Sequence, residues 1–271
     1  MRLLLVAVLV VPFYLLSQTD NFRSRSELGV MAGGMYYIGD LNQFQHFYNT
    51  QVAGSIFYRY TINPRVSFRA NVVAGSVTAS DADASNELLK NRNLNFSSSI
   101  VEGAAGLEVN YFPFQLGNPR YRGTAYLLAQ IGLFRMNPTT QYNGETIELQ
   151  ALGTEGQGTT LTSESRYYLT QLSIPLGVGF KLSLGKSASI NIEYGFRKTF
   201  TDYIDDVGSN TYIDPVLIAN ESGSLAAALS NRSLDGSVNG YRGSTTTSDW
   251  YAFFGLGIAF KLGKQHTCFY Q

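Results

Sequence analysis

The chain has 271 residues, enough for one large or two small domains, and its mean hydropathy of −0.05 excludes a bundle of membrane-spanning helices. Lys and Arg together number 20, as do Asp and Glu, so the formal net charge is zero and nothing indicates a nucleic-acid partner. Only 15% of the residues are charged, whereas the chain has 18 tyrosines, 17 phenylalanines and 27 glycines. This composition is typical of membrane β-barrels, which carry aromatic girdles at the membrane interfaces and use glycine where strands bend.

The N-terminus has the pattern of a secretory signal peptide. Arg2 precedes an unbroken apolar run over residues 3–16, and the small residue Ser17 follows. Roughly 14 apolar residues are too few for a spanning helix, which needs about 20. We therefore expect residues 1–17 to be cleaved during export and residues 18–271 to form the mature chain. Cys268 is the only cysteine, so an internal disulfide is excluded.

Strands with one apolar face are predicted along the whole mature chain. In residues 189–197, large apolar side chains occupy every second position, and polar, charged or glycine residues stand between them. The same alternation occurs in residues 172–181 and 254–262. Because the side chains of a strand point alternately to its two sides, each segment has one apolar and one polar face. The strand-like segments cover about residues 26–37, 50–62, 65–79, 97–112, 123–136, 167–183, 188–200 and 249–262.

The connections between these strands alternate between short and long. Residues 62–65 and 184–187 are tight turns, and residues 113–122 form an intermediate connection. The long polar connections cover about residues 38–49, 80–95, 137–166 and 201–248. Outer-membrane barrels sort their connections in this way, with short periplasmic turns and long extracellular loops, whereas a soluble sandwich does not. We therefore predict an all-β fold: the mature chain is one transmembrane, antiparallel, up-and-down β-barrel of about eight strands in the outer membrane, with its apolar faces towards lipid.

Two segments within the long connections have patterns of their own. Residues 146–150 alternate and are expected to extend a strand pair above the membrane, which leaves a ten-strand barrel as the alternative. Residues 225–229 follow Ser224, a residue type that caps helices, and contain strong helix formers. A short surface helix is expected there.

Charged residues that lie between apolar neighbours are expected to point into the barrel. An eight-strand barrel is just wide enough to be filled by side chains, and a buried charge without a partner is strongly destabilising. The interior should therefore be plugged by paired charges and should not be an open pore. The predicted network consists of Arg59, Arg69, Glu102, Glu108, Lys181, Glu193 and Arg197. Further inward positions are Glu27, Asn110, Gln130 and Lys261, of which Glu27 and Lys261 could equally lie in water at the barrel end.

No catalytic, cofactor-binding or metal site is predicted, and the chain is not expected to be an enzyme. Hydrolysis of lipid would require a histidine beside a serine and a carboxylate. His46 lies in the first long connection and His266 beyond the last strand, so they are expected at opposite ends of the barrel. Two groups of outer-loop acids are candidates for binding Ca²⁺ or for bridging to lipopolysaccharide phosphates, with solvated loop acids as the alternative. They are Asp81, Asp83 and Glu87, and Asp202, Asp205 and Asp206.

Seven short stretches, spread over nearly the whole mature chain, carry a family resemblance. They are residues 27–30, 37–42, 58–65, 92–96, 152–158, 172–177 and 197–207. In their order and spacing they resemble the PorG-like outer-membrane β-barrel proteins of Bacteroidetes, a component family of the type IX secretion system. A serine-rich stretch over residues 236–248 departs from the family pattern.

The resemblance implies a non-enzymatic component of the type IX protein secretion machinery, without cofactors. The barrel of this family is expected to associate with the periplasmic ring formed by the PorK lipoprotein and PorN, so that the periplasmic turns carry the contact. The basic character of these turns is visible in the sequence itself, and a positive rim that faces a negative patch would guide docking. The expected contact residues are Asn63, Pro64, Arg65, Arg120, Arg122, Lys186 and Lys264.

The family motifs in the outer loops begin at the outer ends of two strands. We expect them to pack together as a lid, and a role in loop folding is the alternative. They include Tyr37, Gly39, Asp40, Asp202, Tyr203, Asp205 and Asp206. For the whole chain, the alternative to a secretion component is a stand-alone barrel that acts in adhesion or membrane integrity. A small porin is less favoured because the lumen is expected to be full.

Overall fold

The structure is a computed structural model that describes residues 25–43, 45–237 and 241–262. The predicted signal peptide, together with Lys264, His266 and Cys268, lies outside the described residues.

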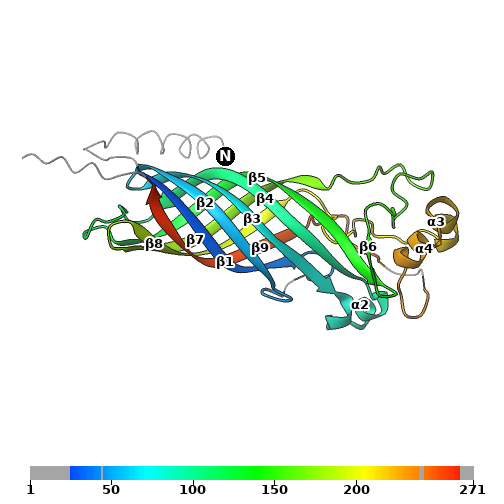
Figure 1. The fold of residues 1–271 in the computed structure, drawn as a ribbon. Helices are drawn as coiled ribbons and strands as arrows, with labels where there is room; N and C mark the ends of the chain where they lie inside the picture. Colours follow the sequence, from blue (N-terminus) through cyan, green and yellow to red (C-terminus); the bar gives the residue numbers. More distant parts are fainter. Residues whose placement is uncertain (1–24, 44, 238–240, 263–271) are drawn as a thin grey trace, which may run out of the picture.

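The described residues form a closed antiparallel barrel (Figure 1). The sheet has nine strands, of which β6 stands outside the barrel, so eight strands close on themselves. β1 pairs with β9 from Ser26–Leu262 to Ile38–Trp250, and this last pairing removes the free edges of the sheet. The barrel strands are β1 (Arg25–Ile38), β2 (Gln51–Asn63), β3 (Val66–Ser80), β4 (Asn95–Asn110), β5 (Gly123–Tyr142), β7 (Thr170–Leu184), β8 (Ala188–Thr199) and β9 (Trp250–Leu262). The predicted fold class is confirmed.

The barrel has eight strands and not ten. The short strand β6 (Glu145–Glu148) pairs with the end of β5, from Thr139–Glu148 to Tyr142–Glu145. Asn143 and Gly144 connect them with φ angles of 51° and 84°, the left-handed conformation of a tight hairpin turn. The hairpin therefore prolongs β5 beyond the barrel, as the alternation predicted. No second strand returns from it into the barrel wall, because residues 149–169 form turns and loop.

Short and long connections lie at opposite ends of the barrel (Figure 1). At the turn end, the connections are residues 64–65, 111–122 and 185–187. At the loop end, residues 39–43, 45–50, 81–94, 149–169, 200–237 and 241–249 form what we call the cap. It contains the short helices η1 (Asp81–Asp83), α2 (Glu87–Arg92), α3 (Pro215–Ser222) and α4 (Ser224–Ser230).

The helix predicted over residues 225–229 is α4, but its start differs from the expectation. Gly223 occupies the cap position, Ser224 is the first helical residue, and no side chain accepts a capping hydrogen bond. Among the described residues, no helix combines the length and the apolar character needed to cross a membrane.

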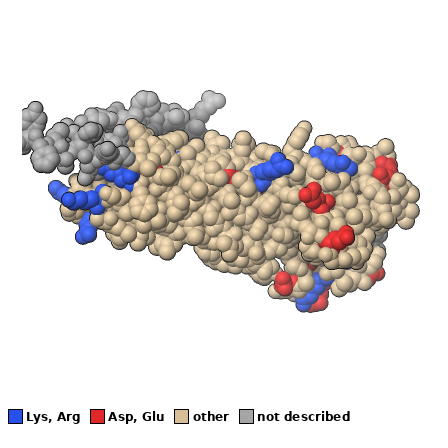
Figure 2. Space-filling model, in the orientation of Figure 1, with Lys and Arg blue, Asp and Glu red and all other residues tan. Residues whose placement is uncertain are grey.

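Large apolar side chains cover the outside of the barrel and form what we call the apolar belt. Ile192 is 55% exposed, and its neighbours Ile190, Tyr194 and Phe196 also face outward. Figure 2 shows the middle of the barrel nearly free of charged side chains. Other members of the belt are Leu28, Val30, Ile56, Phe68, Val72, Val101, Leu107, Leu127, Ile131, Leu133, Leu176, Val178, Phe180, Leu256 and Phe260. An apolar exterior around a buried polar interior is the arrangement that a barrel requires in lipid.

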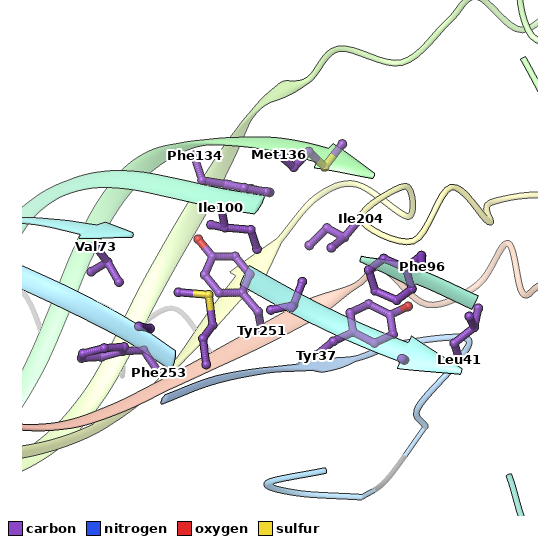
Figure 3. Close-up of a cluster of buried hydrophobic side chains, with 14 of the residues drawn as sticks. Tyr37, Leu41, Val73, Phe96, Ile100, Phe134, Met136, Ile204, Tyr251 and Phe253 are labelled. Atoms are coloured by element: carbon purple, nitrogen blue, oxygen red, sulfur yellow. The ribbon is translucent and has the colours of Figure 1, made fainter. Parts of the chain in front are cut away.

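Buried side chains fill the interior of the barrel, and its two halves differ. The half nearer the turn end holds buried charges. The half nearer the loop end holds an apolar core that includes Val73, Ile100, Phe134, Met136 and Phe253 (Figure 3). The expectation of an interior plugged by paired charges therefore holds for the turn-end half, whereas near the loop end methionine, aliphatic and aromatic residues occupy most inward positions and the pair Glu102–Arg197 lies beside them.

We expect a charge in the apolar belt to destabilise the barrel. Ile131 is 68% exposed on the outer face of β5, and Ile131→Arg should lower the free energy of unfolding. The expected loss is about 2–4 kcal/mol near the middle of the bilayer. Urea unfolding in phospholipid vesicles measures it. The matched control is Leu88→Arg, since Leu88 is 77% exposed on α2 in the cap and should face water. Equal losses for both variants would contradict a lipid-facing belt.

Candidate functional site

Glu108 is the centre of a charge network inside the turn-end half of the barrel. Its carboxylate lies 2.9 Å from Arg59 Nε and 3.3 Å from Arg69 Nη1, and it also accepts a short hydrogen bond from Lys181 Nζ. These four residues come from β2, β3, β4 and β7, and all of them are buried. The carboxylate thus joins four strands at one point.

The two arginines extend the network to further carboxylates. Arg59 donates to Glu27 Oε2 at 2.9 Å, and Arg69 lies 2.5 Å from Glu193 Oε2. Glu193 also accepts a hydrogen bond of 2.9 Å from the Tyr126 hydroxyl. Three cations therefore face three carboxylates, and the cluster is neutral when all six groups are ionised. Such mutual compensation is what makes burial of these charges tolerable.

A second, smaller pair lies above this cluster, next to the apolar core. Glu102 Oε1 lies 3.5 Å from Arg197 Nε, while its Oε2 accepts hydrogen bonds from Ser173 at 2.9 Å and Tyr251 at 2.6 Å. All seven residues of the predicted lumen network are buried, and so are Glu27, Asn110 and Gln130. Lys261 is only half-buried.

At the turn end, the connection between β4 and β5 folds across the mouth of the barrel. Phe114 and Leu116 are buried there, and the Phe114 ring lies 4.7 Å from Lys181 Nζ. The Phe114 amide donates to the Pro64 carbonyl at 2.9 Å, and the Gly117 amide donates to Ser183 Oγ at 3.1 Å. The three turns are therefore bonded into one surface.

Gly117 is required for this closure. Its φ angle of +82° is unfavourable for other residues, and a Cβ atom would lie 2.9 Å from the Lys186 carbonyl oxygen.

The surface of the turn end is positively charged. Arg65, Arg120, Arg122 and Lys186 are exposed, and the described turns contain no Asp or Glu. Figure 2 shows only Lys and Arg among the charged side chains of this end on the visible face. The turns hold the charges in place, because Asn63 Oδ1 accepts from the Arg65 amide at 2.8 Å and the Arg65 side chain donates to the Tyr111 carbonyl at 2.6 Å.

The expected contact residues thus have different positions. Asn63 and Pro64 are half-buried and shape the β2–β3 turn, whereas the four cations point into solvent. Lys264 lies outside the described residues.

Two buried arginines organise the cap. Arg92 donates two hydrogen bonds of 2.7 Å to Asp81 and one of 3.1 Å to the Asp40 carbonyl. It also donates a short hydrogen bond to the carbonyl of Arg242, the second arginine. These contacts connect three of the long loops.

Arg242 belongs to the serine-rich stretch that departed from the family pattern. Its guanidinium forms a short ion pair with Glu155 and donates to the Asp206 carbonyl at 3.2 Å and to Thr154 Oγ1 at 3.3 Å. Arg92 opens one of the stretches that carry the family resemblance, residues 92–96, but its burial and its partners are not predicted from the sequence, and Arg242 carries no motif.

The two outer-loop motifs, residues 37–42 and 197–207, contact each other in the cap. Tyr37 Oη lies 2.6 Å from Asp205 Oδ2 and 2.6 Å from Asp249 Oδ1. A phenol has one proton and can donate to one carboxylate only, so the second contact needs a proton on a carboxyl group. Gly39 leaves room for this arrangement, since a Cβ atom there would lie 2.0 Å from Tyr37 Oη and from Asp249 Oδ1.

The remaining motif residues lie in the same cap. Asp40 Oδ2 accepts from the Ser244 amide at 2.8 Å, and Asp206 accepts from the Tyr167 hydroxyl at 2.6 Å. Tyr203 stacks on Tyr167 with ring centres 4.6 Å apart. Asp202 is half-buried at the edge of the cap.

Burial raises the pKa values of several of these carboxyl groups. Among the described residues, the cap buries six acids, Asp40, Asp81, Glu155, Asp205, Asp206 and Asp249, but only two arginines. Burial, opposed by Arg242, raises the pKa of Asp206 to about 6. Burial raises the pKa of Asp249 to about 7, and burial with the nearby charge of Asp249 raises the pKa of Asp202 to about 8. The pKa of Asp205 is raised as well, first by burial and then by Asp249.

The outer-loop acids do not converge on a metal site in the described part of the chain. Asp81 is bonded to Arg92, Asp83 to the Tyr48 hydroxyl, and Glu87 to Lys90. Within the described residues, no group of three His, Cys, Asp or Glu side chains is placed to hold a metal ion. His46 contacts Tyr36, with Nδ1 3.0 Å from the phenol oxygen.

A family model described as "Domain of unknown function (DUF6089)" matches residues 4–216. No curated protein matches the sequence.

Several solved structures are similar in fold. One is Ail, the attachment invasion locus protein of Yersinia pestis, in complex with the heparin analogue sucrose octasulfate: identity is 8%, the TM-score is 0.43, and 89% of this chain and 100% of Ail are covered. Neisserial surface protein A (NspA) has 12% identity and a TM-score of 0.42, with 89% of this chain and 100% of NspA covered. The outer membrane protein OprG from Pseudomonas aeruginosa has 5% identity and a TM-score of 0.43, with 89% of this chain and 98% of OprG covered.

We expect Glu108→Gln to destabilise the barrel by about 3–5 kcal/mol, because it leaves buried cations without their partner. Urea unfolding in detergent or vesicles measures the loss. Glu145→Gln, which alters an exposed carboxylate on β6, is the matched control and should have little effect. Adding Lys181→Met should restore part of the stability by removing one unpaired cation. A Glu108→Gln barrel as stable as the parent would show that the network is not coupled.

The cap should loosen as the pH rises. Asp202, Asp206 and Asp249 have pKa values near the ordinary 3.8 when unfolded but about 8, 6 and 7 when folded. The folded cap therefore binds more protons above about pH 4, so its stability is greatest below that value and falls as the pH rises through 6 to 8. Hydrogen exchange of residues 200–249, corrected for intrinsic rates, measures this loss.

Asp205→Asn tests whether Asp205 carries the proton that the contacts of Tyr37 with Asp205 and Asp249 require. An asparagine can donate to Tyr37 while still accepting the bond of 2.9 Å from the Val207 amide, as a protonated aspartate would. The variant should keep the cap closed at neutral pH and flatten the pH dependence. Protection that increases with pH in the parent protein would refute this assignment.

Proposed function

The chain belongs to the DUF6089 family, and we propose that it is a non-enzymatic outer-membrane component of the type IX protein secretion machinery. In this role the barrel anchors the complex in the membrane, and its turn end docks the periplasmic ring of PorK-type and PorN-type proteins. The observation that carries the proposal is the turn end, a hydrogen-bonded surface with four exposed cations and, in the described turns, no acid.

The position in the outer membrane is supported by the apolar belt and by the sorting of the connections. Bacterial outer-membrane barrels place short turns on the periplasmic side and long loops outside the cell. On this orientation the turn end faces the periplasm, and the cap faces the cell exterior. A precursor signal peptide, expected over residues 1–17, is consistent with export.

The turn end is suited to docking because it is positively charged and preorganised. Its turns are bonded to one another through Phe114 and Gly117, and Arg65 is held by the Tyr111 carbonyl. A preorganised surface loses little entropy on binding, and its charge would accelerate association with an acidic face of the ring.

A stand-alone role in adhesion or membrane integrity is the second candidate. It is favoured by the ordered cap, in which two buried arginines connect four long loops into one structure that would face the cell exterior. A small porin is disfavoured, because charged residues, apolar residues and the Phe114 closure occupy successive levels of the lumen.

Charge reversal tests the docking role. The variant Arg120→Glu, Arg122→Glu, Lys186→Glu changes exposed side chains only, and it spares Arg65, whose bond to Tyr111 shapes the turn. We expect the ring proteins to be lost from the purified barrel complex, because attraction becomes repulsion. The measurement is co-purification from membranes solubilised in mild detergent.

The matched control reverses three cations away from the turn end: Arg135 and Arg166, which are exposed, and Lys90, which is half-buried and pairs with Glu87. It should retain the ring proteins. Retention of the ring by the turn-end variant would exclude docking through this surface, and no ring protein with the parent barrel would favour the stand-alone role.

A further inference from the structure

An open groove lies on the side of the cap, next to the loop ends of β7 and β8. Its volume is about 460 Å³, and it is lined by residues 164–168, 171, 200–203 and 245–248. This size falls within the range of roughly 300–1,000 Å³ that is usual for small-ligand sites. Part of its lining, residues 245–248, comes from the serine-rich stretch, which has no part in the proposed docking.

One wall of the groove is aromatic. Tyr168 is 80% exposed and Phe200 is 56% exposed, although both lie in the cap beyond the strand ends. Behind them, Tyr203 stacks on Tyr167 at 4.6 Å with an interplanar angle of 6°. The backbone of Tyr168 is fixed by a hydrogen bond of 2.8 Å from Gln171 Nε2 to its carbonyl oxygen. Exposed aromatic side chains on a fixed backbone provide flat apolar surfaces for a ligand.

Another part of the lining carries hydroxyl groups. Residues 245–248 are three threonines and a serine in succession. The segment is anchored at both ends, because the Ser244 amide donates to Asp40 at 2.8 Å and the Asp249 amide donates to the Thr201 carbonyl at 3.0 Å. The hydroxyl groups are therefore presented on an ordered segment.

The polar groups of the groove carry little net charge. Glu164 and Arg166 have opposite signs and are both exposed. Asp202 also lines the groove, and its Oδ1 is a buried atom without a hydrogen-bond partner in the described part of the chain. Because the pKa of Asp202 is raised to about 8, its carboxyl group is largely protonated at neutral pH and can donate as well as accept. A strongly charged ligand would find little to pair with here.

We propose that this groove binds a saccharide. Sugar rings have apolar C–H faces that pack on aromatic rings, and hydroxyl edges that exchange hydrogen bonds with hydroxyl and carboxyl groups. The groove offers Tyr168 and Phe200 for the first and residues 245–248 with Asp202 for the second. The saccharide can come from the lipopolysaccharide of the same membrane or from a free polysaccharide, since both present this chemistry. The inference holds with or without the secretion role.

The test is binding of the purified mature barrel, in detergent, to an array of neutral and acidic oligosaccharides. We expect a subset of the saccharides to be retained. Tyr168→Ala and Phe200→Ala should each lower the affinity for them by about tenfold, which corresponds to the loss of one aromatic contact. Tyr168→Phe should bind as the parent does because it keeps the ring. Tyr241→Ala is the matched control: Tyr241 is 82% exposed in the same loop but does not line the groove.

A second arm distinguishes the two sources and excludes simple contact with lipid. Vesicles with full-length lipopolysaccharide are compared with vesicles that carry lipid A alone, and the barrel is checked for folding by heat-dependent gel mobility. Groove-dependent binding of full-length lipopolysaccharide assigns the membrane source, and binding of free oligosaccharides alone assigns the other. Failure to retain any saccharide, equal binding by the alanine variants and the parent, or equal binding to lipid A alone would overturn the proposal.

Discussion

A strand in lipid can present only apolar side chains to its surroundings, so the polar face of every alternating strand in this chain is turned into a narrow interior. Glu108 carries the main consequence of this constraint. Its carboxylate receives Arg59, Arg69 and Lys181 from three different strands, and the arginines in turn reach Glu27 and Glu193. The apolar outer face and the charged inner face of the strands thus depend on each other. The belt can face lipid because the inward charges on the same strands are compensated by ion pairs.

The charge network also supports the closed surface at the turn end. Lys181 belongs to the ion cluster and at the same time lies 4.7 Å from the ring of Phe114, the residue that closes the mouth. The closed surface that carries the exposed cations is therefore in direct contact with the buried charge network. At the other end the balance differs, because buried acids outnumber buried arginines among the described residues of the cap. The cap should therefore respond to protons.

Most of the barrel could be predicted from the sequence, because alternation is a local property. Ile190 and Ile192 reveal the lipid-facing side of β8 without any knowledge of its neighbours. The partners inside could not be assigned in the same way: Arg69 and Glu193 are 124 residues apart, and their contact depends on how the strands are staggered around the barrel. The roles of Arg92 and Arg242 could not be predicted for a related reason. Arg92 ends the short helix α2 and Arg242 lies in an irregular loop, so no period marks either residue as buried, and only the folded cap brings them together.

The filled interior has a mechanical consequence. A cylinder occupied from end to end by its own side chains offers no route even to an extended polypeptide, which would have to displace both the ion cluster and the core around Phe134 and Phe253. Anything that crosses the bilayer near this protein must pass beside it. In the proposed secretion role, loss of the barrel would leave the secretion channel intact but without its anchor in the membrane.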